Sequence, residues 1–540
     1  MRNKIGFLIL AGLVILIVSA FINFHVWEFI KNFFYPEKII NLEPPLNQEL
    51  INEIRAQIDS SRTWHAIATL FTVIFSLTVI FIATVIILEN RNPSITLSWL
   101  LVLLFIPVLG FIFYLTFGRN YRKKKLVKDK EILNDQLNEL VEQQMHVVSN
   151  EFSFSETHSI NRLVKLILKS SNSPFTKNNT AKVLTNGEET FSEIIEELKK
   201  AKNHIHLEYY IIQDDEIGHK IKDILVERAC SGVEVRVIYD GVGSRKLSLK
   251  YITQLKNAGV KVKCFLPVVM PFLNSKINYR NHRKIIVIDG KVGFVGGLNI
   301  GDEYLGKNAR IGFWRDTHLK LMGDSVYFLQ NIFVQDWHFI GGDWLHGKNY
   351  FPEVERCGNT MVQIAASGPD SEWETIMQAY FTTITSAKKN IYITSPYLIP
   401  DDSILMALKT AALSGVDVRI IVPGKPDKRI VYWASHSYFE ELLEAGVKIY
   451  KYNRGFIHAK LLLVDGTVAS IGTANMDIRS FKFNFEVNAL VYDEAVYKRL
   501  EKDFYTDIEY SDEVTLEEFI NRPLLDKIKE SGARLLSPLL

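Results

Sequence analysis

Cysteine is scarce in this sequence: Cys230, Cys264 and Cys357 are three among 540 residues. Their number is odd and no two have CxxC spacing, so the sequence supports neither a disulfide framework nor a cysteine zinc site. An excess of charge is also lacking, since 63 Lys and Arg residues face 61 Asp and Glu residues. Proteins that bind nucleic acid by neutralising phosphates usually carry a basic excess, so we expect no nucleic-acid partner.

Apolar residues form 47% of the chain, and three uncharged apolar runs lie near the N-terminus, over residues 5–24, 66–88 and 95–117. Each could cross a hydrocarbon core about 30 Å thick as a helix. The last two runs are joined by a turn at Asn92-Pro93, which predicts a transmembrane hairpin over 66–117. The first run is a possible transmembrane helix, preferred to a cleaved signal peptide because no clean small-x-small cleavage site follows it.

A basic cluster follows the hairpin directly, formed by Arg119, Arg122, Lys123, Lys124, Lys125, Lys128 and Lys130. Positive charge at the end of a membrane span marks its cytoplasmic side. We therefore expect everything beyond residue 118 to lie in the cytoplasm. The same cluster would be attracted to anionic membrane lipids.

Beyond residue 180, short β-branched runs alternate with amphipathic ones, which is typical of an α/β fold. Three segments recur in the same order, 183 to 187 residues apart: 201–215 as 387–401, 231–238 as 414–421, and 258–262 as 445–449. The repeats predict duplicated α/β domains with one shared active site. We expect a first segment and linker over 1–65, the hairpin over 66–117, a basic linker and helical connector over 118–180, and two domains over 181–350 and 351–540.

The pattern HxKxxxxD occurs at equivalent places in both copies, as His282, Lys284 and Asp289, and as His458, Lys460 and Asp465. Each motif is followed by a glycine and then an asparagine, Gly296 with Asn299 and Gly472 with Asn475. Alternation along a strand would put His and Lys on one face, pointing into one cavity. Each Asp precedes a Gly, where the strand is expected to turn.

Two histidines, two lysines and two asparagines suit the non-bridging oxygens of a phosphodiester, whose charge grows as phosphorus becomes five-coordinate. A neutral imidazole can attack phosphorus and a charged one can give a proton. Each imidazole needs an acceptor to fix its tautomer, and Asp316 and Glu486 are the candidates, although each could be a structural acid. We expect no cofactor and no catalytic metal, because no carboxylate cluster suited to Mg²⁺ or Ca²⁺ is apparent.

These motifs resemble those of the phospholipase D superfamily over residues 180–510. The chain is similar to bacterial cardiolipin synthases in Gly301-Asp-Glu-Tyr-Leu-Gly, Trp314-Arg-Asp-Thr-His, Ser367-Gly-Pro-Asp-Ser-Glu-Trp and the basic-ended hairpin. The resemblance implies a membrane-bound transferase that makes cardiolipin and glycerol from phosphatidylglycerol, as donor and acceptor, through a phosphohistidine. It also implies His282 as nucleophile and His458 as acid/base, a choice that the near-symmetric copies leave open. Lys284, Lys460, Asn299 and Asn475 would hold the phosphoryl oxygens, and Thr473 could add a hydroxyl.

Two other activities would use the same motifs. A phospholipase would pass the phosphatidyl group to water, and a membrane-tethered nuclease would need a basic groove with stacking aromatics, which the sequence does not display. The resemblance places the chain in the bacterial cell membrane as a multi-pass protein with cytoplasmic catalytic domains. The C-terminal stretch Leu516–Leu540 is expected to be a surface helix packed on the domain, with membrane contact as the alternative. The oligomeric state stays open.

Overall fold

The structure is a computed structural model that describes residues 158–267, 278–308 and 311–540, together with residues 52, 70, 73–74, 77–88, 93–105, 110 and 113–114. The chain divides into two compact units, Met1–Arg119 and Asn120–Leu540, and each is described by itself.

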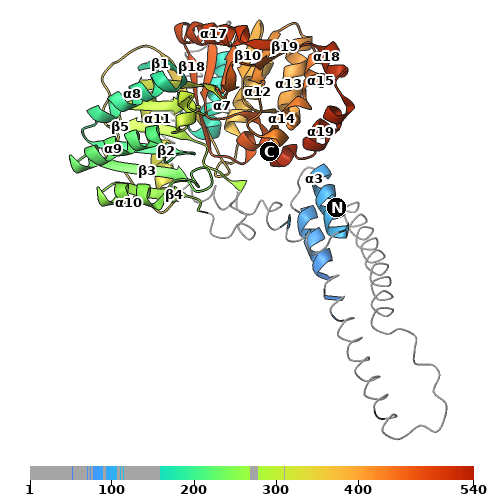
Figure 1. Ribbon diagram of the computed structural model, residues 1–540, viewed down its shortest axis with the longest axis horizontal. Helices are drawn as coiled ribbons and strands as arrows, with labels where there is room; N and C mark the ends of the chain where they lie inside the picture. The colour runs from blue at the N-terminus through green and yellow to red at the C-terminus, as the bar shows by residue number, and fades with distance from the viewer. Residues whose placement is uncertain are drawn as a thin grey trace, which may run out of the picture. The chain divides into compact units, whose positions relative to one another are not determined.

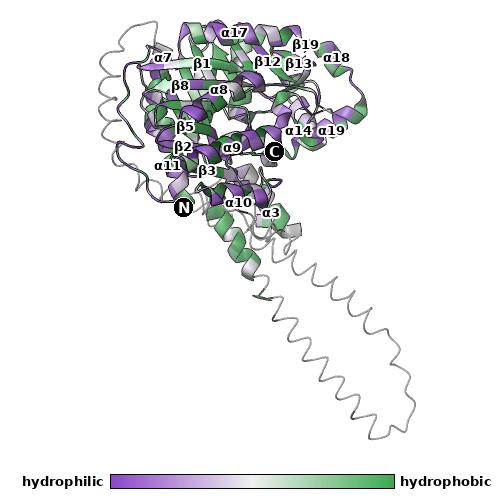
Figure 2. Ribbon diagram, turned by 60° about the vertical axis from the view of Figure 1, so that its left-hand side comes forward, coloured by the Kyte–Doolittle hydropathy of each residue, from purple (hydrophilic) through white to green (hydrophobic). Residues whose placement is uncertain are grey.

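The first unit is helical where it is described, over residues 77–88 and in α3 (Pro93–Phe105). Proline suits the first helical position because its missing N–H would have no partner there. The described helical residues are strongly apolar (Figure 2), and Ile86, Leu103 and Tyr114 are buried among them. Among the described residues, no helix reaches the length and hydropathy that a membrane crossing requires. The predicted run 5–24 lies outside the described residues, and 66–88 and 95–117 are described in part.

The second unit begins with α7 (His158–Ser171), within the predicted connector. The elements of the first repeat follow in this order: β1 (Asn179–Thr185), α8 (Asn186–Lys200), β2 (His204–Tyr209), α9 (Glu216–Cys230), β3 (Glu234–Asp240), α10 (Leu249–Asn257), β4 (Lys261–Phe265), β5 (Lys284–Ile288), β6 (Val292–Gly296), the 3-10 helix η3 (Asp302–Leu305), β7 (Phe313–Arg315), β8 (Thr317–Gly323) and α11 (Ser325–Phe339).

The second repeat contains β9 (Met361–Ser367), α12 (Thr375–Thr385), β10 (Asn390–Thr394), β11 (Leu398–Ile399), α13 (Asp402–Leu413), β12 (Asp417–Pro423), α14 (Arg429–His436), α15 (Phe439–Glu444), β13 (Lys448–Tyr452), β14 (Gly455–Ile457), β15 (Leu461–Val464), β16 (Val468–Gly472), β17 (Met476–Asp477), α16 (Ile478–Lys482), β18 (Glu486–Tyr492) and α17 (Glu494–Glu509). The chain ends with β19 (Ser511–Val514), α18 (Leu516–Ile520), α19 (Leu524–Arg534) and the 3-10 helix η4 (Ser537–Leu539).

The strand order confirms the duplication. One sheet has the order β1-β8-β6-β5-β2-β3-β4, and the other has β9-β18-β16-β15-β10-β12-β13 with β19 added at its edge. In each sheet the three strands from β2 or β10 outward are parallel, and the rest are antiparallel. Helices α9 and α13 occupy equivalent places and begin at the N-caps Asp215 and Asp401, whose carboxylates accept backbone N–H groups three residues on.

The two sheets face each other across a shared apolar core that contains Val287, Val295, Ile471 and Val487, all fully buried. Figure 1 shows α8, α9 and α10 on one side of the strands and α13 and α15 on the other, so each sheet also has a helical layer on its outer face. Helix α7 precedes the first repeat but packs on α12 and β9 of the second. Each repeat therefore covers the apolar face of the other, as expected for domains built in packed layers.

Candidate active site

Both motifs lie where the chain leaves its own sheet and pairs with the opposite repeat. The backbone N–H of His282 donates to the carbonyl of Phe485 (2.9 Å), and that of His458 donates to the carbonyl of Arg315 (2.7 Å). The short strand β14, just before His458, runs parallel to β7 of the first repeat. Strand β5 begins at Lys284 and β15 begins at Leu461, so both histidines precede their strands rather than lie within them as expected. The backbone N–H of each histidine therefore forms a hydrogen bond with the opposite repeat instead of within its own sheet.

The partner carboxylates are exchanged between repeats. His282 Nδ1 lies 2.9 Å from Glu486 Oε2 of the second repeat. His458 Nδ1 lies 2.8 Å from Asp316 Oδ2 of the first. Both carboxylates are fully buried, and both histidine residues are 8% exposed. Each histidine is thus oriented by the half that does not carry it, so neither half alone contains a complete pair.

Glu486 is held in its ionised form by the groups around it. Thr473 Oγ1 donates to Glu486 Oε2 (2.5 Å), and Asn484 Nδ2 donates to the other carboxylate oxygen (3.1 Å). Burial opposes ionisation, but His282, Lys284 and the Thr473 hydroxyl together lower the pKa of Glu486 below its ordinary value.

Asp316 has a different environment, although it occupies the equivalent place. Burial raises the pKa of Asp316 to about 6, against the charge of Lys460 and the backbone N–H of Thr317. The counterpart of Thr473 in the first repeat is Gly297, where even a Cβ would overlap the Asp316 carboxylate. Lys460 Nζ lies 2.9 Å from His458 Nδ1, so Asp316 and Lys460 compete for the same ring nitrogen.

The four central basic groups are strongly desolvated. Burial lowers the pKa of His282 to about 4 and that of His458 well below its ordinary value. Burial likewise lowers the pKa of Lys284 to about 7 and of Lys460 to about 8. The charges of Lys284 and His282 also act on His458, so the two motifs form one electrostatic site. An anionic phosphodiester entering the site would favour the protonated form of every one of these groups.

The predicted phosphate-binding residues are brought close to the motifs but make contacts of their own. Asn299 Nδ2 donates to the Tyr304 hydroxyl (2.6 Å), and Asn475 Nδ2 donates to Asp477 (3.1 Å). The Thr473 hydroxyl donates to Glu486, which differs from the expectation that it adds a hydroxyl for the phosphoryl group. Thr473 therefore acts on the histidine pair through its carboxylate.

Asp289 and Asp465, which the motif groups with the catalytic residues, lie at the far ends of β5 and β15. Both have φ near +54° and precede a glycine with positive φ, as in the Asp-Gly turns of tight hairpins. The Asp289 carboxylate accepts the backbone N–H groups of residues 202, 203 and 204, and the Asp465 carboxylate accepts those of residues 388, 389 and 390. In the structure these carboxylates fix the strands that carry the site, and a part in the chemistry stays a prediction.

Aromatic residues that sequence reasoning had not assigned to the site surround both imidazoles. The Tyr210 ring meets His282 edge-on at a centroid distance of 5.0 Å, and the Trp314 ring lies 5.5 Å from His458. Tyr210 follows β2 directly, and Trp314 stands two residues before Asp316. The sequence signal that could have identified them is that Tyr210 lies in the repeated segment 201–215 and Trp314 lies close to the candidate carboxylate Asp316. The rings lie against the imidazoles and contribute to their burial.

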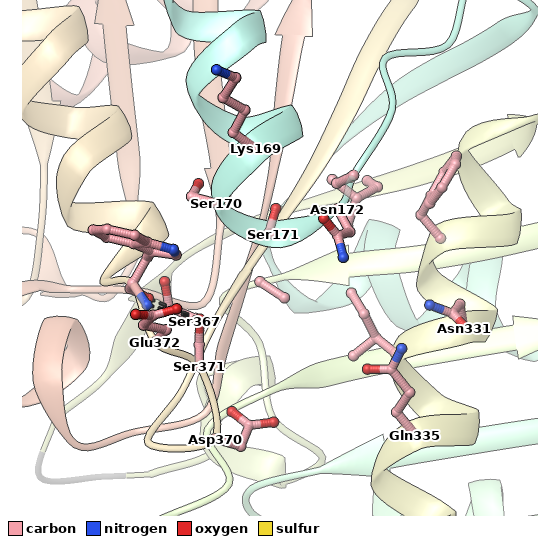
Figure 3. Close-up of a pocket in the computed structure, with 16 residues that line it drawn as sticks. Lys169, Ser170, Ser171, Asn172, Asn331, Gln335, Ser367, Asp370, Ser371 and Glu372 are labelled. Atoms are coloured by element: carbon pink, nitrogen blue, oxygen red, sulfur yellow. Dashed lines mark hydrogen bonds between the residues drawn. The ribbon is translucent and has the colours of Figure 1, made fainter. Parts of the chain in front are cut away.

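A separate cavity of about 230 Å³ lies between α7, α11 and the segment after β9. Figure 3 shows Ser367, Asp370 and Glu372 on one side of it, with Asn331 and Gln335 of α11 on the other. None of the predicted site residues lines it, so we assign the chemistry to the buried histidine pair.

Two buried histidines, each bonded to a carboxylate from the opposite repeat and each near a lysine, define a phosphotransferase site of the phospholipase D type. The family model described as "Cardiolipin synthase, PLD-like domain" matches residues 194–337 and 380–508, and "Phospholipase D-nuclease N-terminal" matches residues 76–119.

Relatives and solved structures agree with this assignment. The chain is 53% identical to the cardiolipin synthase of Alkalihalophilus pseudofirmus over 87% of its length and 93% of that protein. It is 45% identical to the major cardiolipin synthase ClsA of Bacillus subtilis over 87% and 99% of the two chains. The crystal structure of Haemophilus influenzae phosphatidylserine synthase has the same fold, with a TM-score of 0.55, 16% identity, and coverage of 70% of this chain and 100% of that one. The chain therefore belongs to the cardiolipin synthase family of the phospholipase D superfamily.

Proposed function

We propose that this enzyme is a membrane-bound phosphatidyltransferase that makes cardiolipin and glycerol from two phosphatidylglycerol molecules through a phosphohistidine intermediate. The observation that carries the proposal is the pair of crossed contacts, His282 with Glu486 and His458 with Asp316. Family membership supports the substrate class. The N-terminal run 5–24 and the hairpin 66–117 would hold the enzyme in the bacterial membrane, with catalytic halves over 181–350 and 351–540 in the cytoplasm.

We assign His282 as the nucleophile. The carboxylate of Glu486 is kept ionised by its surroundings and accepts the Nδ1–H of His282. Its negative charge stabilises the positive charge that develops on the imidazole when Nε2 attacks phosphorus. The bond between phosphorus and the glycerol oxygen of the donor breaks as the bond between phosphorus and Nε2 forms.

We assign His458 as the acid and base. Burial lowers the pKa of the His458 imidazole and raises that of the Asp316 carboxyl, so the two pKa values move toward each other. The two groups therefore titrate as a pair. The pair would give its proton to the departing glycerol. It would then take a proton from the primary hydroxyl of the second phosphatidylglycerol, whose oxygen displaces Nε2 of His282. Lys284 and Lys460 would stabilise the negative charge on the phosphoryl oxygens at both steps.

Labelled phosphatidylglycerol, incubated with the purified enzyme in detergent, tests the proposal through its products. Cardiolipin with glycerol is the expected result. Phosphatidic acid alone would make the enzyme a hydrolase, and no lipid turnover would overturn the proposal. Activity should survive thorough chelation, because the lysines supply the positive charge at phosphorus. Reporter fusions after residue 130 should report a cytoplasmic location.

A further inference from the structure

Helix α19 presents its apolar side to the outside of the catalytic unit. Its exposed apolar residues, with the two that follow it, form what we call the α19 face: Leu524 (73% exposed), Leu525 (68%), Ile528 (59%), Leu535 (83%) and Leu536 (41%). At 100° per residue these five positions fall within about one third of the helix circumference. A helix that packs on a domain normally buries such a stripe, and the sequence-based expectation for this segment was a helix of that kind.

The opposite side of α19 binds the protein through polar groups. Glu530 is 5% exposed and accepts from Arg522 Nε (2.7 Å). Arg534 donates to Glu441 (2.6 Å) and to the carbonyl of Ser437 (3.1 Å). These contacts fix the rotation of α19, so the outward direction of its leucines is set by polar anchoring.

The α19 face lies beside the active site. Helix α19 packs on α14, and the two are visible side by side in Figure 1. The 3-10 helix η4 contacts α16, whose N-cap Asp477 accepts from Asn475 of the second motif. Residues 425–429, which we call the basic loop, lead into α14 and end at its first residue. Within them Asp427 accepts from the Tyr397 hydroxyl (2.6 Å), and Tyr397 directly precedes β11, which pairs with β17 just after Asn475. The α19 face therefore adjoins the elements that support the second motif.

The segment that leads into α14 exposes positive charge next to an apolar residue. Lys425 and Lys428 are exposed just before α14, and Arg429 and Ile430 (48% exposed) are exposed in its first turn. Apolar side chains flanked by lysine and arginine are typical of protein surfaces that lie in the interface of an anionic bilayer. Binding to a bilayer explains why the α19 face borders a site for lipid, whereas binding to a second protein chain does not.

We propose that the α19 face, with Ile430 and the basic loop 425–429, is a docking surface for an anionic lipid bilayer. Docking would hold the catalytic unit with its entrance against the headgroup layer, so that phosphatidylglycerol reaches the histidines without leaving the membrane. The choice of an anionic lipid rests on the proposed function. This contact is separate from any anchoring by the N-terminal runs.

Residue Leu413 offers a matched control. It is 72% exposed, close to the 73% of Leu524, but it ends α13 just before β12 begins. The basic loop follows the other end of β12, so Leu413 and the basic loop lie at opposite ends of that strand. Met406, 62% exposed on the same helix, provides a second control position.

The first test measures contact with lipid directly. Full-length enzyme with its three cysteines replaced by serine is reconstituted into phosphatidylcholine–phosphatidylglycerol liposomes, and an environment-sensitive fluorophore is attached to L524C or L413C. Nitroxide-labelled lipids should quench the probe at position 524 and leave the probe at position 413 unchanged. Equal quenching at both sites, or none at 524, would overturn the proposal. A blue shift at 524 that appears in detergent and grows with protein concentration would assign the face to a second copy.

The second test separates docking from chemistry. We expect L524Q/L525Q/I528Q to lose roughly tenfold or more of the turnover on liposomes but less than twofold on dispersed short-chain phosphatidylglycerol. The M406Q/L413Q control should keep both activities, and thermal unfolding should verify that each variant is folded. Equal loss on both substrates would make α19 a support of the site and overturn docking. If the wild-type enzyme turned over no phosphatidylglycerol, the proposed function would fail while the quenching result still decided the docking surface.

Discussion

The two copies of the motif share a backbone plan but differ in how the partner carboxylate is held. Glu486 receives the Thr473 hydroxyl and is kept ionised, whereas Asp316 lies against Gly297 and has a pKa raised to about 6. One residue difference at equivalent positions, Thr against Gly, therefore accompanies opposite shifts in proton affinity. Duplication supplied two similar histidine sites, and the surroundings of the carboxylates make them suited to different steps.

Removing each histidine should have the largest effect, and a different one in each copy. His282→Ala should abolish the trapped phosphatidyl-enzyme and reduce turnover by about 10⁴-fold or more, since the nucleophile itself is lost. His458→Ala should still form the adduct slowly when the donor carries a good leaving group that needs no proton. Acid-quenched labelling with a nitrophenyl phosphodiester measures both. If His458→Ala abolished labelling while His282→Ala retained it, the two roles would be exchanged.

Exchange of each carboxylate for its amide should give unequal losses. We expect Glu486→Gln to slow adduct formation by roughly 10²–10⁴-fold, because the amide cannot stabilise a positive imidazole. Asp316→Asn should slow adduct formation little with a nitrophenyl donor, yet strongly reduce turnover of phosphatidylglycerol, whose leaving group needs a proton. Single-turnover rates with the two donors distinguish these effects. Equal losses in both variants would show that the difference between the two carboxylates has no catalytic consequence.

The capping aspartates should behave alike in the two copies. Asp289→Asn and Asp465→Asn each replace a carboxylate that accepts three backbone N–H groups, and we expect each to lower the free energy of unfolding by about 1–3 kcal/mol. Under conditions in which each variant is fully folded, the pH profile of its activity should be unchanged. Denaturant titration measures the first effect. A shifted pH profile at full folding would return these residues to the chemistry.

Local sequence was sufficient for the duplication and for the pairing of His with Lys, because both depend on residues close together in the chain or on segments that repeat. Asp316 and Glu486 were also found, as acids at the start of equivalent strands. The exchange of these acids between repeats was not predictable, because it depends on β7 pairing with β14 and on Phe485 bonding to His282. Such contacts join residues more than 140 positions apart.

The roles of Thr473 and of the α19 leucines could not be predicted for a related reason. A threonine in place of serine beside the motif suggested another phosphate ligand, and only its distance to Glu486 assigns the hydroxyl to the carboxylate. The pattern of α19 predicts an amphipathic helix but cannot tell which side faces the domain. That orientation is fixed by Glu530 and Arg534, whose partners lie elsewhere in the chain.

Thr473 allows the difference between the two carboxylates to be tested at a single hydrogen bond. Thr473→Val keeps the shape of the side chain but removes the hydroxyl that lowers the pKa of Glu486. The pKa of Glu486 should rise, so the carboxylate is protonated at a higher pH as acid is added. Adduct formation at His282 should then begin to fall at a higher pH, by roughly half to one unit, with a rate loss of about threefold to tenfold at neutral pH.

Thr473→Ser keeps the hydroxyl and is the matched control, for which we expect the acidic limb of the wild-type enzyme. Single-turnover labelling between pH 4 and 8 measures the limb apart from the later steps. The corresponding substitution cannot be made in the first repeat, because a side chain at position 297 would overlap Asp316. The acid-sensitive limb of adduct formation should therefore respond to the residue at 473. An unchanged limb in Thr473→Val would mean that His282 and Lys284 alone keep Glu486 ionised, and that the hydroxyl has only a structural part.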